Sequence, residues 1–255
     1  MMLLAVTAAI AECASYSTVE ESRRISDIPV PSGFTRTTPS PASFGSWVAD
    51  LPLKPGNEIL LHTGRVLSAH RYRVLAVVDK PLLFDEDLEQ CVDFCLRLWG
   101  DYHYERGLLD QLYFFSTNGE KVFFSSWRSL QPASSATDVE TLYHDFLKAA
   151  LSWTNPYSIT LGAYPLEPED LRPGDCIIQT TGRALGQTSL VLDQCTDNGG
   201  HDLFLMGFGF SPAQELHIEK APDECGQGGW FSLKGYFRYL ETYYGDFGKP
   251  RLFRL

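Results

Sequence analysis

The sequence predicts an α+β protein in which helices come before a run of antiparallel strands. Two stretches, 85–106 and 138–153, carry apolar residues at helical spacing. Short apolar segments bounded by glycine- and asparagine-rich turns then follow between residues 176 and 219. Because this order differs from the strand–helix alternation of parallel α/β proteins, we expect one domain with a central antiparallel sheet and two main packed helices.

Each predicted helix has a residue that can cap its free N–H groups. Asp85 or Asp87 can cap the first long helix, which puts Cys91 in its second turn on the apolar face. The second long helix runs over 138–153. A shorter helix is expected from Phe44, with Ser43 as its cap, and it ends before Pro52.

The strands are predicted from apolar runs and turn signals. Segments 58–62 and 72–79 read as strands, and a hairpin is expected over 112–125 around Asn118-Gly119. The turn Pro173-Gly174-Asp175 leads into a buried strand, and a second buried strand begins at Gly186-Gln187. Further strands are expected near residues 201–207 and 215–219.

Charge and hydropathy exclude two classes of partner. The chain has 255 residues and a formal net charge of -11, from 21 basic and 32 acidic side chains. Its longest basic run is the pair Arg23-Arg24, so nothing would neutralise a phosphate backbone, and we expect no nucleic-acid partner. No internal segment is apolar enough to span a membrane.

The first residues resemble a targeting segment. Residues 1–14 have a short apolar core and a small-x-small pattern at Ala9-Ile10-Ala11, which predicts a signal peptide, although a basic start is missing. A truncated start, a plain first helix or a lipid-bearing Cys13 are the alternatives. We then expect an extended, proline-rich lead-in over 15–43, a single α+β domain over 44–255, and a periplasmic or extracellular location with membrane anchoring left open.

Several common machineries are missing from the sequence. There is no H-E-x-x-H, no G-x-S-x-G and no phosphate-binding glycine loop, so we expect no cofactor. The histidines are scattered, and the cysteines include no C-x-x-C pair, so we expect no metal site. Without Cys13, an odd number of cysteines remains, which leaves at least one thiol free.

One arrangement could support nucleophilic chemistry. A cysteine hydrolase needs a thiol on a helix and a general base on a strand behind it, because the base takes the thiol proton and returns it to the leaving amine. Cys91 precedes the predicted sheet and is the candidate nucleophile, whereas Gln187 stands where a base would be useful. Two small core cysteines, Cys91 and Cys95, are the simpler interpretation.

Four short motifs stand out as a set. They are Ser43-Phe44-x-x-Trp47-x-x-x-Leu51-Pro52-Leu53-Lys54-Pro55-Gly56, Asp87-Leu88-x-Gln90-Cys91-x-Asp93-x-x-x-Arg97-Leu98, Gly174-Asp175-x-x-Ile178 and Pro212-Ala213-Gln214-Glu215-x-His217-Ile218. Together they resemble an uncharacterised bacterial family, domain of unknown function number four thousand eight hundred and forty-six, over nearly everything after residue 25. This family consists largely of predicted exported or lipoprotein-like chains.

A more distant resemblance is architectural. The order of a helical cysteine, a Pro-Gly-Asp strand and a further strand is similar to papain-like amidases of the NlpC/P60 type, which cut the peptide stems of peptidoglycan. The resemblance implies a papain-like fold, a cell-envelope location and a peptide or glycan ligand. This chain departs from that pattern at Gln187, where the expected residue is histidine, and a carboxamide cannot act as a general base near neutral pH.

The resulting hypothesis is a degenerate cysteine-amidase cleft that binds a peptidoglycan-like or peptide ligand without turnover. The first alternative is an active cysteine amidase or peptidase in which His217 or His201 supplies the base. The second is a structural or partner-binding accessory protein. The oligomeric state stays open.

Further residues are candidates for ligand contacts. Gln214 and His217 could line a groove, and Trp127 with Arg128 could form an aromatic, cation-bearing wall, although core packing of the tryptophan is the competing interpretation. Asp175 is a further candidate, and it could equally cap the turn by accepting backbone N–H bonds.

Overall fold

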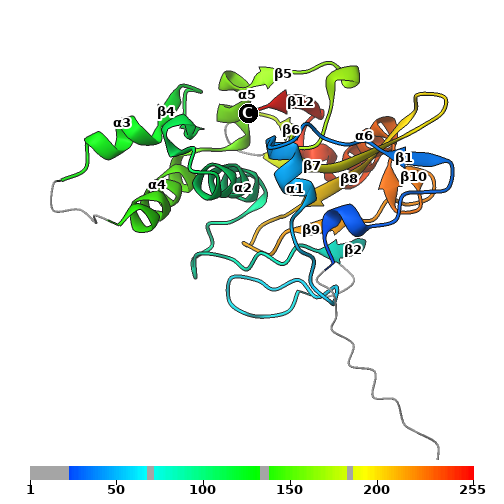
Figure 1. The fold of residues 1–255 in the computed structure, drawn as a ribbon, viewed down its shortest axis with the longest axis horizontal. Helices are drawn as coiled ribbons and strands as arrows, with labels where there is room; N and C mark the ends of the chain where they lie inside the picture. The colour runs from blue at the N-terminus through cyan, green and yellow to red at the C-terminus, as the bar shows by residue number, and fades with distance from the viewer. Residues whose placement is uncertain (1–22, 68–71, 133–137, 183–185) are drawn as a thin grey trace, which may run out of the picture.

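The computed structural model describes residues 23–67, 72–132, 138–182 and 186–255. The predicted signal peptide over residues 1–14 and Cys13 lie outside this part of the chain. The described residues combine a large antiparallel sheet with several helices (Figure 1). The α+β class expected from the sequence is therefore confirmed at the level of a mixed fold with a large antiparallel sheet.

The main sheet has the strand order β10-β11-β8-β7-β6-β12-β5, with β1 paired to β7 and with β9 pairing both β8 and β2. Its strands are β1 Phe34–Arg36, β2 Val74–Val77, β5 Tyr164–Pro165, β6 Cys176–Thr180, β7 Gly186–Asp197, β8 Asp202–Phe208, β9 His217–Glu219, β10 Gly226–Gln227, β11 Trp230–Phe231 and β12 Arg251–Arg254. The strands expected near residues 176–219 are thus present.

Strand β7 organises the sheet because it is long enough to pair with two strands along one edge. Its first half pairs with β6, with Cys176 opposite Leu190. Its second half pairs with β1, with Phe34 opposite Asp197. Strand β8 runs along the other edge.

Two helices lie on one side of the sheet, the first directly against strand β7 and the second packed on the first. They are α2 Cys91–Glu105 and α4 Val139–Trp153, and α4 begins at the expected residue because the Asp138 side chain accepts a hydrogen bond from Thr141 N. Alternate strand residues such as Ile178 and Leu190 enter the same apolar core as Phe94 and Phe146. Each such fully buried side chain contributes roughly 1.5–3 kcal/mol to folding.

A third long helix covers the opposite face. Helix α6, Leu233–Tyr244, packs Tyr236 and Tyr239 against the other set of strand residues, including Ile177 and Met206. The expectation of two main helices was therefore wrong. The buried side of α6 carries Tyr236, Tyr239 and Leu240 at helical spacing, so the sequence contained a periodic signal for this helix that the prediction did not use.

Shorter elements complete the fold. They are α1 Phe44–Ala49, α3 Phe124–Ser129, α5 Pro156–Gly162, the separate hairpin β3 Tyr113–Phe115 and β4 Lys121–Phe123, and the 3-10 helices Ile25–Asp27, Leu109–Gln111, Pro168–Asp170 and Gly245–Phe247. The hairpin and the Ser43 cap of α1 agree with the predictions. The strand expected over 58–62 is wrong, because Leu60 and Leu61 make only isolated bridges.

The proline-rich residues before α1 are integrated into the fold. Ile25 is fully buried in the apolar core, and β1 pairs with the edge of β7. Arg36 of β1 also forms an ion pair with the buried Asp193, at 2.8 Å. None of the helices in the described ranges is long and apolar enough to cross a membrane.

Candidate functional site

Cys91 is the first residue of helix α2, and this differs from the predicted position in the second turn. The helix begins later than expected because Gln90, rather than Asp85 or Asp87, is its N-cap. The Asp93 carboxylate accepts the Gln90 backbone N–H at 3.1 Å, as the acidic residue of a capping box does. Cys91 is therefore placed at the helix N-terminus, where reactive thiols are often found.

The Cys91 thiol lies against the start of strand β7. Its Sγ donates to the Gly186 carbonyl at 4.0 Å and accepts a hydrogen bond from the Thr188 backbone N–H. Burial raises the pKa of the thiol to about 12, and the Thr188 hydrogen bond lowers it only in part. The thiol is thus protonated at neutral pH. It forms hydrogen bonds with backbone groups of Gly186 and Thr188 at the start of β7.

Gln187 is next to Cys91 in space, but its side chain turns to the opposite face of the sheet. Its neighbour across the ladder, Gln179, donates to Tyr244 O and Gly248 O at the end of α6. Gln187 itself donates from Nε2 to Gly209 O at 3.0 Å and Thr188 O at 3.3 Å. Its Oε1 has no partner among the described residues.

Gly209 lies between Cys91 and Gln187, the two residues predicted to occupy catalytic positions. It accepts the Gln187 hydrogen bond, and a Cβ added to it would stand 3.7 Å from Cys91 Cα. Within the described chain, no hydrogen bond links the Gln187 amide to the Cys91 thiol. The two residues are therefore neighbours that do not form the nucleophile–base pair a hydrolase requires.

A polar pocket of about 300 Å³ opens beside Cys91. Helix α2 supplies Cys91 and Asp93, the preceding segment supplies Asp87 and Gln90, and the remaining lining comes from Leu88, Val92, Leu151, Thr154, Asn155, Pro156, Gly182 and Gly186. Gly186 must lack a side chain, because a Cβ there would meet Pro156 Cβ at 2.6 Å and Gln179 O at 2.9 Å. We call this cavity the Cys91 pocket.

Asp93 is the most perturbed carboxyl of the Cys91 pocket. It is 6% exposed, and its Oδ1 has no hydrogen-bond partner in the described structure. Burial raises the pKa of Asp93 to about 8, the hydrogen bond from Gln90 lowers it, and the charge of Glu89 adds to the rise. The Gln90-Cys91-x-Asp93 spacing of a capping box was the available signal for this residue.

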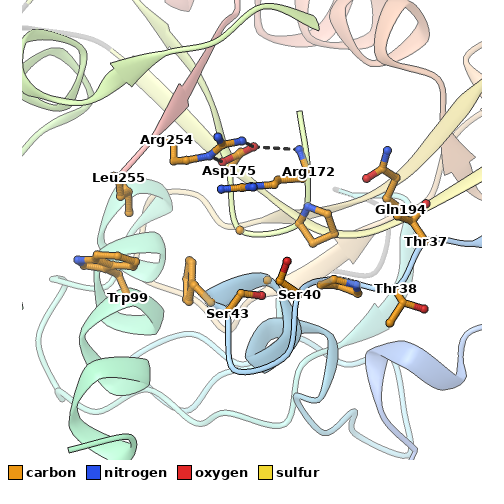
Figure 2. Close-up of a pocket in the computed structure, with 15 residues that line it drawn as sticks. Thr37, Thr38, Ser40, Ser43, Trp99, Arg172, Asp175, Gln194, Arg254 and Leu255 are labelled. Carbon is orange, nitrogen blue, oxygen red and sulfur yellow. Dashed lines mark hydrogen bonds and ion pairs between the residues drawn. The ribbon is translucent and has the colours of Figure 1, made fainter. Parts of the chain in front are cut away.

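Asp175 lines a second, larger pocket of about 450 Å³. Its Oδ1 accepts from Arg254 Nε at 2.7 Å, and its Oδ2 accepts from Arg254 Nη2 at 2.8 Å and from Arg172 N at 2.9 Å. Figure 2 shows these three residues on one side of the pocket, with Ser43 and Trp99 on the other. Asp175 thus caps its turn and holds the C-terminal strand, as the capping interpretation expected.

The other predicted contact residues are dispersed. Trp127 packs on Phe146 in the helical core, at 5.2 Å between ring centroids, and Arg128 is exposed on the same helix α3. Neither residue lines the Cys91 pocket or the Asp175 pocket. Gln214 is fully buried, its amide atoms have no hydrogen-bond partner among the described residues, and it too lines neither pocket.

His217 belongs to a buried polar cluster. Its Nε2 lies 2.7 Å from Glu219 Oε2, and Tyr239 donates to the other oxygen of the same carboxyl. His201 is instead exposed and bonds to Asp197 across a turn. Neither imidazole bonds to Cys91, so neither supplies a base to it in this arrangement.

Thiols and possible metal ligands complete the inventory. The described cysteines, Cys91, Cys95, Cys176, Cys195 and Cys225, are all free. In the described ranges, no group of three or more His, Cys, Asp or Glu side chains is placed to hold a metal ion.

Fold and site together define a mixed α/β protein with a polar pocket at the N-terminus of a buried helix. A family model described as "Domain of unknown function (4846)" matches residues 25–254, so the chain belongs to that family. No curated protein and no solved structure matches the chain. The comparisons therefore establish the family of this chain and do not assign an activity to it.

Proposed function

We propose that the Cys91 pocket is a non-catalytic binding cleft for a peptide or peptidoglycan-like ligand. The observation that carries this proposal is an open polar pocket beside a cysteine whose thiol is held in its protonated form. A pocket with backbone and side-chain hydrogen-bonding groups suits a peptide-like ligand. The protonated thiol, and the absence of an imidazole bonded to it among the residues that the structure describes, argue against turnover.

The degenerate cysteine-amidase interpretation draws its support from local geometry. A cysteine at the start of a helix, packed on the first residues of a strand, is the placement that a papain-like amidase uses for its nucleophile. Gln187 follows Gly186 at the start of that strand and cannot take a proton from the thiol. The NlpC/P60-like ancestry is therefore part of the proposal.

The cell-envelope location rests on the sequence. The apolar N-terminal residues and the resemblance to exported bacterial chains support a periplasmic or extracellular protein, with Cys13 as the candidate lipid-bearing residue. Peptidoglycan is the peptide-bearing polymer that such a protein meets. This makes the sacculus the first ligand to test.

The test is retention on purified peptidoglycan sacculi in a sedimentation assay. We expect the protein to be retained above an unrelated protein of similar acidic charge. Gln90→Trp adds bulk at the pocket lining and should reduce retention at least fivefold. Gln227→Trp, on the exposed edge strand β10, is the matched control and should bind as the unmodified protein does. Equal retention of the two variants would show that the ligand does not bind in the Cys91 pocket.

An active amidase is the second candidate, because the helix N-terminus is a position that lowers thiol pKa values in other proteins. Incubation of the protein with sacculi, followed by chromatography of released peptides, separates the two functions. We expect no release above that of Cys91→Ala. Release that depends on Cys91 would establish the enzyme instead.

A further inference from the structure

Asp93 lines the Cys91 pocket, and its carboxyl group contains a buried oxygen that has no hydrogen-bond partner among the described residues. Its Oδ2 accepts the Gln90 backbone N–H, whereas no described residue donates to the buried Oδ1. A buried carboxyl oxygen that lacks a donor costs about 1–3 kcal/mol or more. Such a cost is commonly offset when a ligand supplies the missing donor.

The charges around this carboxyl favour a cationic donor. Asp87 lines the same pocket and lies at its exposed side, and Glu89 adds negative charge nearby. Arg97, the neighbouring cation on α2, is engaged by Glu89 at 2.5 Å. Among the described lining residues, α4, α5 and the β6–β7 hairpin contribute no charged side chain.

We infer that the Cys91 pocket recognises a primary ammonium group of its ligand, with Asp93 as the counter-ion and Asp87 as a second carboxylate at the rim. This inference rests on the proposed function and names the chemical group that the cleft selects. An ammonium group supplies three donors from a compact charge, which suits a narrow pocket with carboxylate and amide acceptors. Gln90 and Asn155 supply amide groups in the same lining.

A divalent metal fits this pocket less well. Asp87 Oδ1 already accepts the Ala213 N–H at 2.5 Å, and Asp93 Oδ2 accepts the Gln90 N–H. Mg²⁺ and Ca²⁺ require about six or more oxygen ligands, and the described lining has only these two carboxylates. Mg²⁺ is therefore an informative competitor in the test.

Recognition of an ammonium group by Asp93 predicts that the affinity for the ligand depends on pH. The ligand binds the ionised Asp93, and a carboxyl with a pKa of about 8 is ionised to about 1% at pH 6 and to about 90% at pH 9. An alkylammonium stays charged throughout, because its pKa lies near 10.4. Apparent affinity should therefore fall on the order of 100-fold from pH 9 to pH 6.

The experiment is an NMR titration of the full chain with n-butylammonium at pH 6, 7.5 and 9, following the backbone amides of residues 90–94. We expect saturable shifts that strengthen with pH, and no comparable shifts with n-butanol or with Mg²⁺. Asp93→Asn keeps an oxygen for the Gln90 N–H and should bind at least tenfold more weakly. Asp110→Asn, at an exposed position that does not line the pocket, is the matched control. Equal binding by Asp93→Asn, or equal shifts with n-butanol, would overturn the inference.

Acetylated sacculi separate this inference from the proposed function. Acetic anhydride converts free amines of the peptide stems into neutral amides. Retention on native sacculi that is lost on acetylated ones supports both proposals. Retention on both kinds overturns the ammonium inference and leaves the binding cleft intact. Retention on neither, together with butylammonium binding in solution, overturns the peptidoglycan proposal alone.

Discussion

Two buried carboxylates show how differently one fold can treat the same chemical group. Asp175 is 2% exposed and Asp93 is 6% exposed, so both are removed from water. Asp175 receives two hydrogen bonds from Arg254 and one from the Arg172 backbone, whereas Asp93 receives the Gln90 backbone N–H and keeps one oxygen without a partner.

The difference teaches that burial alone does not mark a functional site. A buried carboxylate that is paired with a bidentate arginine has a structural role. Here the ion pair links the Pro173 turn to the C-terminal strand β12. A buried carboxyl that borders a pocket and has no countercharge among the described residues holds its proton instead, and it can exchange that proton for a ligand cation. The following predictions test this contrast.

The largest effect is expected from Asp93→Asn as a function of pH. The folded pKa is about 8 and the unfolded value is about 3.9, so between these values the folded protein holds a proton that the unfolded chain releases. Stability of the unmodified protein should therefore fall as pH rises from 4 to 8. The variant lacks this fall and should gain on the order of 5 kcal/mol at pH 9, with almost no gain at pH 4.

Urea unfolding at pH 4, 6, 8 and 9 measures this gain. Asp110→Asn should follow the pH profile of the unmodified protein, because its carboxyl is exposed. If Asp93→Asn also followed that profile, the folded protein would not hold a proton on Asp93, and the contrast with Asp175 would be wrong.

The second prediction concerns the thiol beside Asp93. With its pKa raised to about 12, Cys91 should react with iodoacetamide at pH 7.5 about 3,000-fold more slowly than an ordinary thiol of pKa about 8.5, in proportion to its smaller thiolate fraction. Mass spectrometry of timed digests gives the rate. The same peptide in guanidinium chloride is the internal control and should label rapidly. Rapid labelling of the folded protein would favour the amidase.

Removing the partner of the saturated carboxylate should have a somewhat smaller effect. Arg254→Leu leaves Asp175 buried with only the Arg172 backbone N–H, and we expect a destabilisation of about 3 kcal/mol in urea unfolding. Arg251→Leu removes an exposed arginine from the same strand and is the matched control. If Arg254→Leu lowered the free energy of unfolding by less than about 1 kcal/mol, the Asp175–Arg254 ion pair would not be a main contributor to stability.

The smallest effect is expected from closing the wall of the Cys91 pocket. Gly186→Ala places a Cβ within 2.6 Å of Pro156 and should cost about 1–3 kcal/mol as well as weaken ligand retention. Gly56→Ala meets no atom within 4 Å and serves as the control in the same unfolding assay. A fully stable Gly186→Ala would show that α5 can move away from β7.

Local patterns predicted much of the secondary structure. Ser43 and Asp138 cap the helices expected for them, and Asn118-Gly119 makes the expected hairpin, because capping and turn formation depend on a few neighbouring residues. The start of α2 was misplaced, since Asp87 bonds to the distant Ala213 and Glu89 to Leu83 and Phe84 rather than capping a helix. Those partners depend on the assembled fold.

The candidate site was predicted in part. Cys91 does lie beside the first residues of β7, as the helix–hairpin arrangement expected. The side chain of Gln187 lies on the face of the sheet that α6 covers, however, and bonds to Gly209 O, and the predicted wall residues Trp127 and Arg128 line neither pocket. Asp93 was visible only as part of a family-like motif.

The sequence by itself determined family membership, the antiparallel strand run, the helix caps and the lack of a base at position 187, because these follow from residue identity and short-range spacing. Only the tertiary structure decided which carboxylate would be paired. Asp175 meets an arginine 79 positions away, whereas Oδ1 of Asp93 has no partner among the described residues. Desolvation and long-range pairing set the charge of a buried group, and both exist only after the chain has folded.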